Sequence, residues 1–479
     1  MGGAGIVYLV LTAFYARPIA DDWSALATLG HVGFVDTLTS SGRYTTQALV
    51  WIVVRLFGAG SAQATPLIVL AATWAASGWG LRVVARAAGL TVPLWELAAL
   101  ALLAVVACVS VAPSLIDNVA WLSGVAGYTT PLAAAACLTA VCWQLASRNV
   151  KHPVIAGIAV LAGGFATAGF HELVGAVLCA AALLALLTAR DLRSSRSLLG
   201  AIAAGGTGAV AGLTLNLTNP ATSRRASNQH AHVGVVAALH TAWHDLSFFS
   251  AAVEHGLVAL ALALGVVLWQ LFGSALTPRL RRWMFAWSAF LILVPWLIVS
   301  AVTAWARATE SGDRAPFRTA FLFTSAAALG TALLVVALLS LAPRLLSQRR
   351  ASLVALVLAA AGLVALAHAA TPLLRAERLR VQAVAQRAAS VERQLASGRT
   401  RIQLLPAPLL AVDTQALDLS FAPIARQRPA LVKLLRSYYD VPPRDTVTVV
   451  SRQPRGYCLP GVAASWVGVQ SCQELDGER

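Results

Sequence analysis

The chain has 479 residues, of which 58% are hydrophobic and only 12% are charged, and its formal net charge is +16. A soluble domain carries about twice that fraction of charged residues, so this composition excludes an ordinary soluble globular protein. Apolar runs of roughly 20 residues, the length that crosses a bilayer, recur from the N-terminus to about residue 370. We therefore expect an α-helical polytopic membrane protein.

The apolar runs, taken in chain order, predict about eleven transmembrane helices within residues 1–370. Their expected ranges are 1–17, 64–81, 92–112, 126–146, 154–170, 173–189, 198–216, 251–272, 284–305, 319–342 and 351–370. The segment between the seventh and eighth helices, 217–250, is expected to be a long polar loop outside the membrane.

The basic residues gather in clusters that fall on every second loop between these runs, as the positive-inside rule requires of cytoplasmic loops. The clusters are Arg82 and Arg86; Arg148 and Lys151; Arg190, Arg193 and Arg196; Arg279, Arg281 and Arg282; and Arg344, Arg349 and Arg350. We therefore attribute the positive charge to topology and lipid head groups, and do not expect a nucleic-acid partner. The N-terminus is predicted to be cytoplasmic and the C-terminus extracytoplasmic.

The first outer loop, 18–63, contains an apolar stretch that does not fit as a span. Residues 45–58 are too few to cross a bilayer, include Arg55, and would reverse the direction of all later helices if they crossed it. We expect this stretch to lie in the outer interface, as one of two surface helices in the loop. A re-entrant helix packed in the core is the alternative.

The loops expected outside the membrane carry the chemically interesting side chains. Asp21 and Asp22 stand where the chain first leaves the membrane, where acids are rare unless they have a use. Arginines on this side run against the positive-inside trend and need an anionic partner, and a guanidinium group suits phosphate or carboxylate. The remaining candidates are Arg43, Tyr44, His171, Glu172, Arg224, Arg225, Arg314 and Arg318.

Each of these patterns also has a plainer interpretation. Paired acids can mark a solvated helix end, and adjacent arginines in a long loop are commonly a solvated turn. His171 and Glu172 can form a hydrogen-bonded pair that locks the packing of helices. Tyr128, at the outer end of the predicted span 126–146, is interpreted as an aromatic residue of the membrane interface.

Residues 371–479 differ in character and predict a small extracytoplasmic α/β domain. Residues 375–398 form an amphipathic helical pattern, and 401–405 and 447–451 are short apolar segments among polar residues. Roughly 100 residues can form a modest hydrophobic core of their own.

Cys458 and Cys472 are the cysteines of this tail, and in an extracytoplasmic domain such a pair predicts a disulfide. A zinc site is disfavoured, because the tail contains no histidine and the spacing does not match. The other four cysteines lie inside expected helices, where we interpret them as small apolar fillers.

Several short segments occur together in an order that is typical of a known family. They are Ala-Asp-Asp-Trp at 20–23, Gly-Arg-Tyr at 42–44, Phe57-Gly58, Gly-Val-Ala-Gly-Tyr-Thr-Thr-Pro at 124–131, Glu172 in a short outer loop, and Tyr438-Tyr439 in the tail. This arrangement resembles the GT-C superfamily of integral-membrane glycosyltransferases, and within it bacterial members related to O-antigen glucosyltransferases and actinobacterial arabinofuranosyltransferases. Residues 219–225 depart from the family's Pro-Gly-Asn…Arg pattern, because Pro and Asn are transposed and the Gly is missing.

The resemblance implies an inverting glycosyltransferase that moves a sugar from a polyprenyl-phosphate donor to a cell-envelope glycan or lipid acceptor. Asp21, with Asp22 as second candidate, would be the general base on the acceptor hydroxyl. Tyr44, His171 and Glu172 would support the substrate. The arginines that would bind the donor phosphate are Arg43, Arg224, Arg225, Arg314 and Arg318.

A divalent cation that bridges an acid and the phosphate is left open, and the sequence fixes no metal site, sugar or acceptor. High alanine and arginine content with little lysine is typical of a GC-rich bacterium, so we expect the bacterial inner membrane.

Two other classes of function compete with the transferase. A transporter or flippase for a lipid-linked or sugar substrate would show internal repeats with broken helices and charges near the midplane of the bilayer. No repeat is visible, and the charges lie at one face. A non-catalytic anchoring protein would tolerate replacement of the outer acids and arginines.

Overall fold

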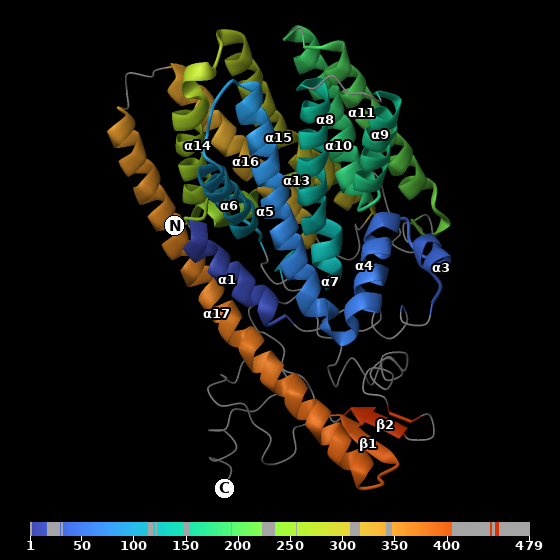
Figure 1. Cartoon of the computed structure of the whole chain (residues 1–479). Helices are drawn as coiled ribbons and strands as arrows, with labels where there is room; N and C mark the ends of the chain where they lie inside the picture. The colour runs from blue at the N-terminus through green and yellow to red at the C-terminus, as the bar shows by residue number, and fades with distance from the viewer. Residues whose placement is uncertain are drawn as a thin grey trace.

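The fold is described from a computed structural model of the chain (Figure 1). The structure describes residues 2–16, 29, 32–113, 118–119, 122–147, 153–192, 194–222, 235–254, 256–306, 317–341, 347–404, 441–442 and 446–449.

The described part of the chain is an α-helical bundle in which eight helices are long and apolar enough to cross a membrane. This confirms the class of α-helical polytopic membrane protein. The eight are α5 (Ser61–Ala87), α8 (Thr130–Ser147) with the preceding α7 (Leu122–Gly124) and η3 (Val125–Thr129), α10 (Glu172–Asp191), α11 (Arg196–Thr218), α14 (Val258–Phe272) with η4 (Gly273–Ala275), α15 (Pro278–Ala306), α16 (Phe317–Leu341) and the first part of α17 (Gln348–Ala396).

Three further spans that the sequence predicts correspond to shorter apolar helices. These are α1 (Gly2–Phe14), α6 (Leu94–Ser110) and α9 (Pro153–Ala168), with 13, 17 and 16 residues. At about 1.5 Å per residue they are about 20 to 26 Å long, less than the roughly 30 Å of a hydrocarbon core. The total of eleven spans therefore stays a prediction.

Two kinds of contact occur between the helices. Where α1, α6, α14, α16 and α17 meet, large side chains such as Phe321, Phe323 and Leu260 are fully buried. Helices α9 and α11 instead approach backbone to backbone, since a Cβ on Gly164 or Gly208 would collide with a carbonyl oxygen of the other helix. Helix α10 packs on both α11 and α15.

The segment expected to be a polar outer loop contains a helix, α13 (Val235–Glu254). It packs on α15, where Trp296 Nε1 donates to Ala242 O at 3.2 Å and Ser300 Oγ donates to Asp245 Oδ2 at 2.7 Å. The next span begins at Val258 rather than at 251, because Gly256 adopts a positive φ of 69° and separates two helices.

Two helices lie within the predicted first outer loop, α3 (Phe34–Thr39) and α4 (Tyr44–Phe57). The single turn η1 (Gly58–Gly60) joins α4 to α5, and Gly58 has a positive φ of 53° that ends α4. The location of these two helices in the outer interface stays a prediction.

The last predicted span and the amphipathic helix of the tail are one continuous helix. The 49 residues of α17 cross the side of the bundle and continue beyond it (Figure 1). At its far end β1 (Arg401–Leu404) and β2 (Thr446–Val449) pair in parallel, with Ile402 opposite Val447. The α/β domain over 371–479 stays a prediction, and Cys458 and Cys472 lie outside the described residues.

Candidate functional site

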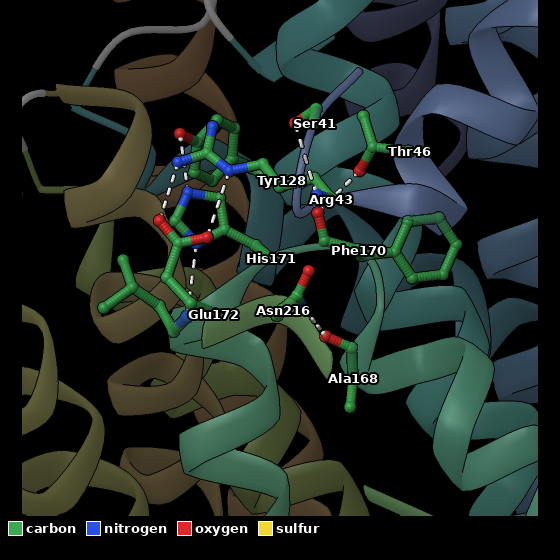
Figure 2. Close-up of polar contacts among 10 residues, drawn as sticks. Ser41, Arg43, Thr46, Tyr128, Ala168, Phe170, His171, Glu172 and Asn216 are labelled. Carbon is green, nitrogen blue, oxygen red and sulfur yellow. Dashed lines mark hydrogen bonds and ion pairs between the residues drawn. The ribbon is translucent and has the colours of Figure 1, made fainter. Parts of the chain in front are cut away.

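The candidate site centres on an ion pair between two residues that are 129 positions apart (Figure 2). Arg43 Nε donates to Glu172 Oε2 at 3.1 Å, and Arg43 Nη2 donates to Glu172 Oε1 at 2.8 Å. Both side chains are only 19% exposed. The planar guanidinium fork therefore meets the carboxylate edge to edge, the geometry that fixes an arginine most firmly.

His171 and Tyr128 extend this pair into the protein. His171 caps α10, and its Nδ1 accepts a hydrogen bond from the backbone N–H of Leu173 at 3.2 Å. Because Nδ1 accepts, this network assigns the ring proton to Nε2, which lies 3.1 Å from Tyr128 Oη and donates to it. His171 is 2% exposed and Tyr128 is 3% exposed, so the aromatic pair is sealed from solvent.

The electrostatic balance keeps the arginine charged. Burial alone would lower the pKa of Arg43, but the adjacent carboxylate of Glu172, helped by Tyr128, outweighs burial and raises the pKa above its ordinary value. A guanidinium group has five N–H bonds; Glu172 accepts two of them, and Tyr128 is a further side-chain hydrogen-bond partner of Arg43. The group therefore keeps donor capacity for another anion.

The first turn of α4 holds Arg43 in place by binding the end of α9 and the junction that follows it. Arg43 is the N-cap of α4. Three consecutive side chains then donate to carbonyl oxygens of the α9–α10 junction: Tyr44 Oη to Phe165 O at 2.7 Å, Thr45 Oγ1 to Ala166 O at 2.7 Å and Thr46 Oγ1 to Phe170 O at 2.6 Å. Burial also raises the pKa of Tyr44, so its hydroxyl stays a donor.

Two glycines permit this close contact between segments. A Cβ on Gly169 would collide with the ring of Tyr44. A Cβ on Gly42 would collide with Thr222 Oγ1 and lie 2.7 Å from Asn216 O at the end of α11. The Gly-Arg-Tyr order thus has a physical basis, in which Gly42 allows the approach, the arginine forms the ion pair and the tyrosine anchors the turn.

An apolar cavity of about 350 Å³ lies between α8 and α9. Thr45, two residues after Arg43, and Phe170, next to His171, are among the residues that line it. Apolar side chains such as Leu138, Val141 and Val160 line the remainder. Residues next to the ion pair in sequence thus line an apolar space, and this combination of charge and apolar surface is suited to an amphiphilic anion.

The structure brings together four residues of the sequence-predicted set, namely Arg43, Tyr44, His171 and Glu172. Arg318 lies in the first turn of α16, with its side chain outside the described part. The other candidates lie outside the described residues: Asp21, Asp22, Arg224, Arg225 and Arg314.

Sequence reasoning misplaced Tyr128, which we expected at the membrane interface. It is buried and bonded to His171 because the π-helical turn η3 directs it inward, and such turns are frequent at functional sites. The sequence signal that could have identified Tyr128 was its place in the segment 124–131, one of the segments that carry the family resemblance. Asn216, whose Nδ2 donates to Ala168 O at 2.8 Å, was also missed as a support.

Within the described ranges, no group of three or more His, Cys, Asp or Glu side chains is arranged to hold a metal ion. Comparison of the chain with models of protein families, with curated proteins and with solved structures found no match.

Proposed function

We propose that this protein is an inverting glycosyltransferase of the bacterial inner membrane. It would transfer a sugar from a polyprenyl-phosphate donor to a cell-envelope glycan or lipid acceptor on the extracytoplasmic side. Two kinds of observation support this proposal: the sequence motifs that resemble the GT-C superfamily, and the charged and apolar groups at the candidate site.

The observation that carries the proposal is the Arg43–Glu172 ion pair, together with an apolar cavity that Thr45, two residues after Arg43, helps to line. Arg43 keeps N–H groups that Glu172 does not use, and the cavity next to Thr45 is lined mostly by apolar side chains. A polyprenyl phosphate combines an anionic group with a long apolar chain. The arginine suits the first and the cavity suits the second.

The proposed reaction needs a base for the acceptor and a site for the leaving group. Asp21 or Asp22 would take the proton of the acceptor hydroxyl as its oxygen bonds to the anomeric carbon. The carbon–oxygen bond to the phosphate breaks at the same time, and the electron pair leaves with polyprenyl phosphate. Arg43 would stabilise the charge that develops there.

The remaining residues would either position the charged groups or add positive charge at the donor phosphate. Glu172 would be a positioning residue that holds the guanidinium of Arg43, and Tyr128, which is bonded to His171, would hold the same guanidinium. Arg224 and Arg225 follow Thr222, which packs at Gly42, by two and three positions in the chain. They would add positive charge at the donor phosphate, together with Arg314 and Arg318.

The test is transfer by the purified full chain in nanodiscs, with radiolabelled polyprenyl-phosphosugars as donors and a cell-wall lipid fraction as acceptor. Asp21→Asn and Asp22→Asn are compared with Asp36→Asn, an exposed acid of the same loop that serves as the matched control. We expect wild type and the control to transfer sugar, and one of the paired variants to lose about 10²-fold or more in rate.

Full activity in both paired variants would remove these acids from catalysis. Binding of the donor without transfer from any tested sugar would favour the transporter instead.

A further inference from the structure

Helix α5 turns into α6 at its end opposite α4 (Figure 1). A second cavity lies at this turn. Its volume is about 470 Å³. Arg82 and Arg86 line it from α5, and Leu90, Val92 and Leu94 line it from the turn and the start of α6. The proposed transfer reaction uses none of these residues.

The turn that forms this cavity has a defined backbone conformation. Gly89 has a positive φ of 71°, its N–H donates to Arg86 O at 3.1 Å, and the N–H of Leu90 donates to Ala85 O at 2.9 Å. This pattern is a Schellman motif, which ends a helix in one defined conformation. Pro93 then caps α6, so both walls of the cavity are set by the backbone.

The two arginines share one face of α5, because residues four positions apart on a helix are neighbours. No ion pair within the described ranges engages either of them. Glu96 is the only acid between 82 and 97, and it does not line the cavity. One wall of the cavity therefore carries two positive charges without a compensating carboxylate.

The other wall is apolar and continues onto the outer surface of the bundle. Leu94 is 65% exposed, and Trp95, next to it, is 71% exposed. Tryptophan is enriched where a membrane protein meets the lipid head groups. A small free anion such as phosphate would contact the arginines but would leave this apolar wall uncovered.

We propose that this cavity binds an anionic phospholipid. Arg82 and Arg86 would bind the phosphate of the head group, and an acyl chain would lie against Leu90, Val92 and Leu94. Basic pockets between helices at the cytoplasmic side are known to take such head groups, and each basic side chain contributes to the attraction. The site would hold one lipid in a fixed place at this end of the bundle.

The test counts bound lipid by native mass spectrometry on the full-length protein in detergent, titrated with phosphatidylglycerol or with phosphatidylcholine. We expect wild type to prefer phosphatidylglycerol and Arg82→Gln/Arg86→Gln to lose that preference by roughly tenfold or more. Each single variant is expected to lose about fivefold, which keeps the proposal testable if the double variant does not fold.

The matched control is Arg196→Gln/Arg282→Gln, which removes the same charge from exposed arginines at other helix ends. It should bind phosphatidylglycerol as wild type does. An equal loss in the control would reduce the effect to general surface charge. Unchanged binding in folded variants at 82 and 86, or competition by glycerol phosphate as effective as by the lipid, would overturn the proposal.

Discussion

The two ends of α10 carry the same chemical pair in different surroundings. At its start Glu172 accepts two hydrogen bonds from Arg43, and both side chains are 19% exposed. At its end Asp191 accepts two from Arg279 on α15, at 3.0 and 2.8 Å, but these side chains are 40% and 45% exposed. Distances alone do not distinguish the two pairs.

The difference lies in what surrounds each carboxylate. Asp191 has one further partner, Trp283 Nε1 at 2.7 Å, and otherwise faces the exterior, as expected of a brace between two helices. Glu172 lies against buried His171, and its arginine precedes a turn whose Tyr44 and Thr46 side chains are hydrogen-bonded to Phe165 O and Phe170 O. Keeping a charged pair out of solvent costs desolvation free energy, so the Arg43–Glu172 end of α10 is the better candidate for function.

Of the substitutions that distinguish the two ends of α10, Glu172→Gln is expected to have the largest effect on stability. It leaves the Arg43 guanidinium without its counter-charge in a mostly buried position, and we expect a loss of about 3 kcal/mol in the free energy of unfolding. Denaturant titration of the purified protein in a mild detergent measures this loss. A change no larger than that of Asp191→Asn would mean that burial does not distinguish the two pairs.

An intermediate effect is expected from Gly169→Ala. The added methyl group would collide with Tyr44 and Thr45, so α4 must move away from α9, with a loss of roughly 1–3 kcal/mol in stability. Gly200→Ala on α11 is the control, because a Cβ there meets no atom within 4 Å. Equal stability in both variants, measured in the same titration, would show that the turn at Arg43 is not sterically fixed.

The smallest effect is expected from Asp191→Asn. Exposed ion pairs contribute about 0 to 1 kcal/mol, and the amide oxygen can still accept from Trp283. We expect thermal unfolding close to that of wild type and unchanged sugar transfer. A loss of transfer in a folded variant would assign function to this end as well.

The helical class and eight of the spans could be predicted from the sequence, because length and hydropathy set them. Helix α13 could not, since its histidines and aspartate lower the apolar signal while its buried face is determined by contact with α15. The continuity of α17 across residue 370 was hidden by a change in composition that does not interrupt the helix.

The candidate site, like the fold, could be predicted from the sequence only in part. Arg43 and Glu172 could be selected singly by their type and their position in outer loops. Their pairing could not, because it depends on how α4 docks on α9, across 129 residues of sequence. Tyr128 was misassigned because an aromatic residue near a helix end fits the membrane interface and a buried hydrogen bond equally well before packing is known.

The most direct test of the account is the binding of a polyprenyl phosphate to protein in nanodiscs made from a neutral lipid. Arg43→Gln/Glu172→Gln removes both charges and leaves no unpaired carboxylate, and Arg279→Gln/Asp191→Asn is the matched change at the other end of α10. We predict that the first variant binds the lipid phosphate at least about tenfold more weakly than wild type, while the second binds it equally well. Wild-type affinity in a folded Arg43→Gln/Glu172→Gln variant would contradict the account.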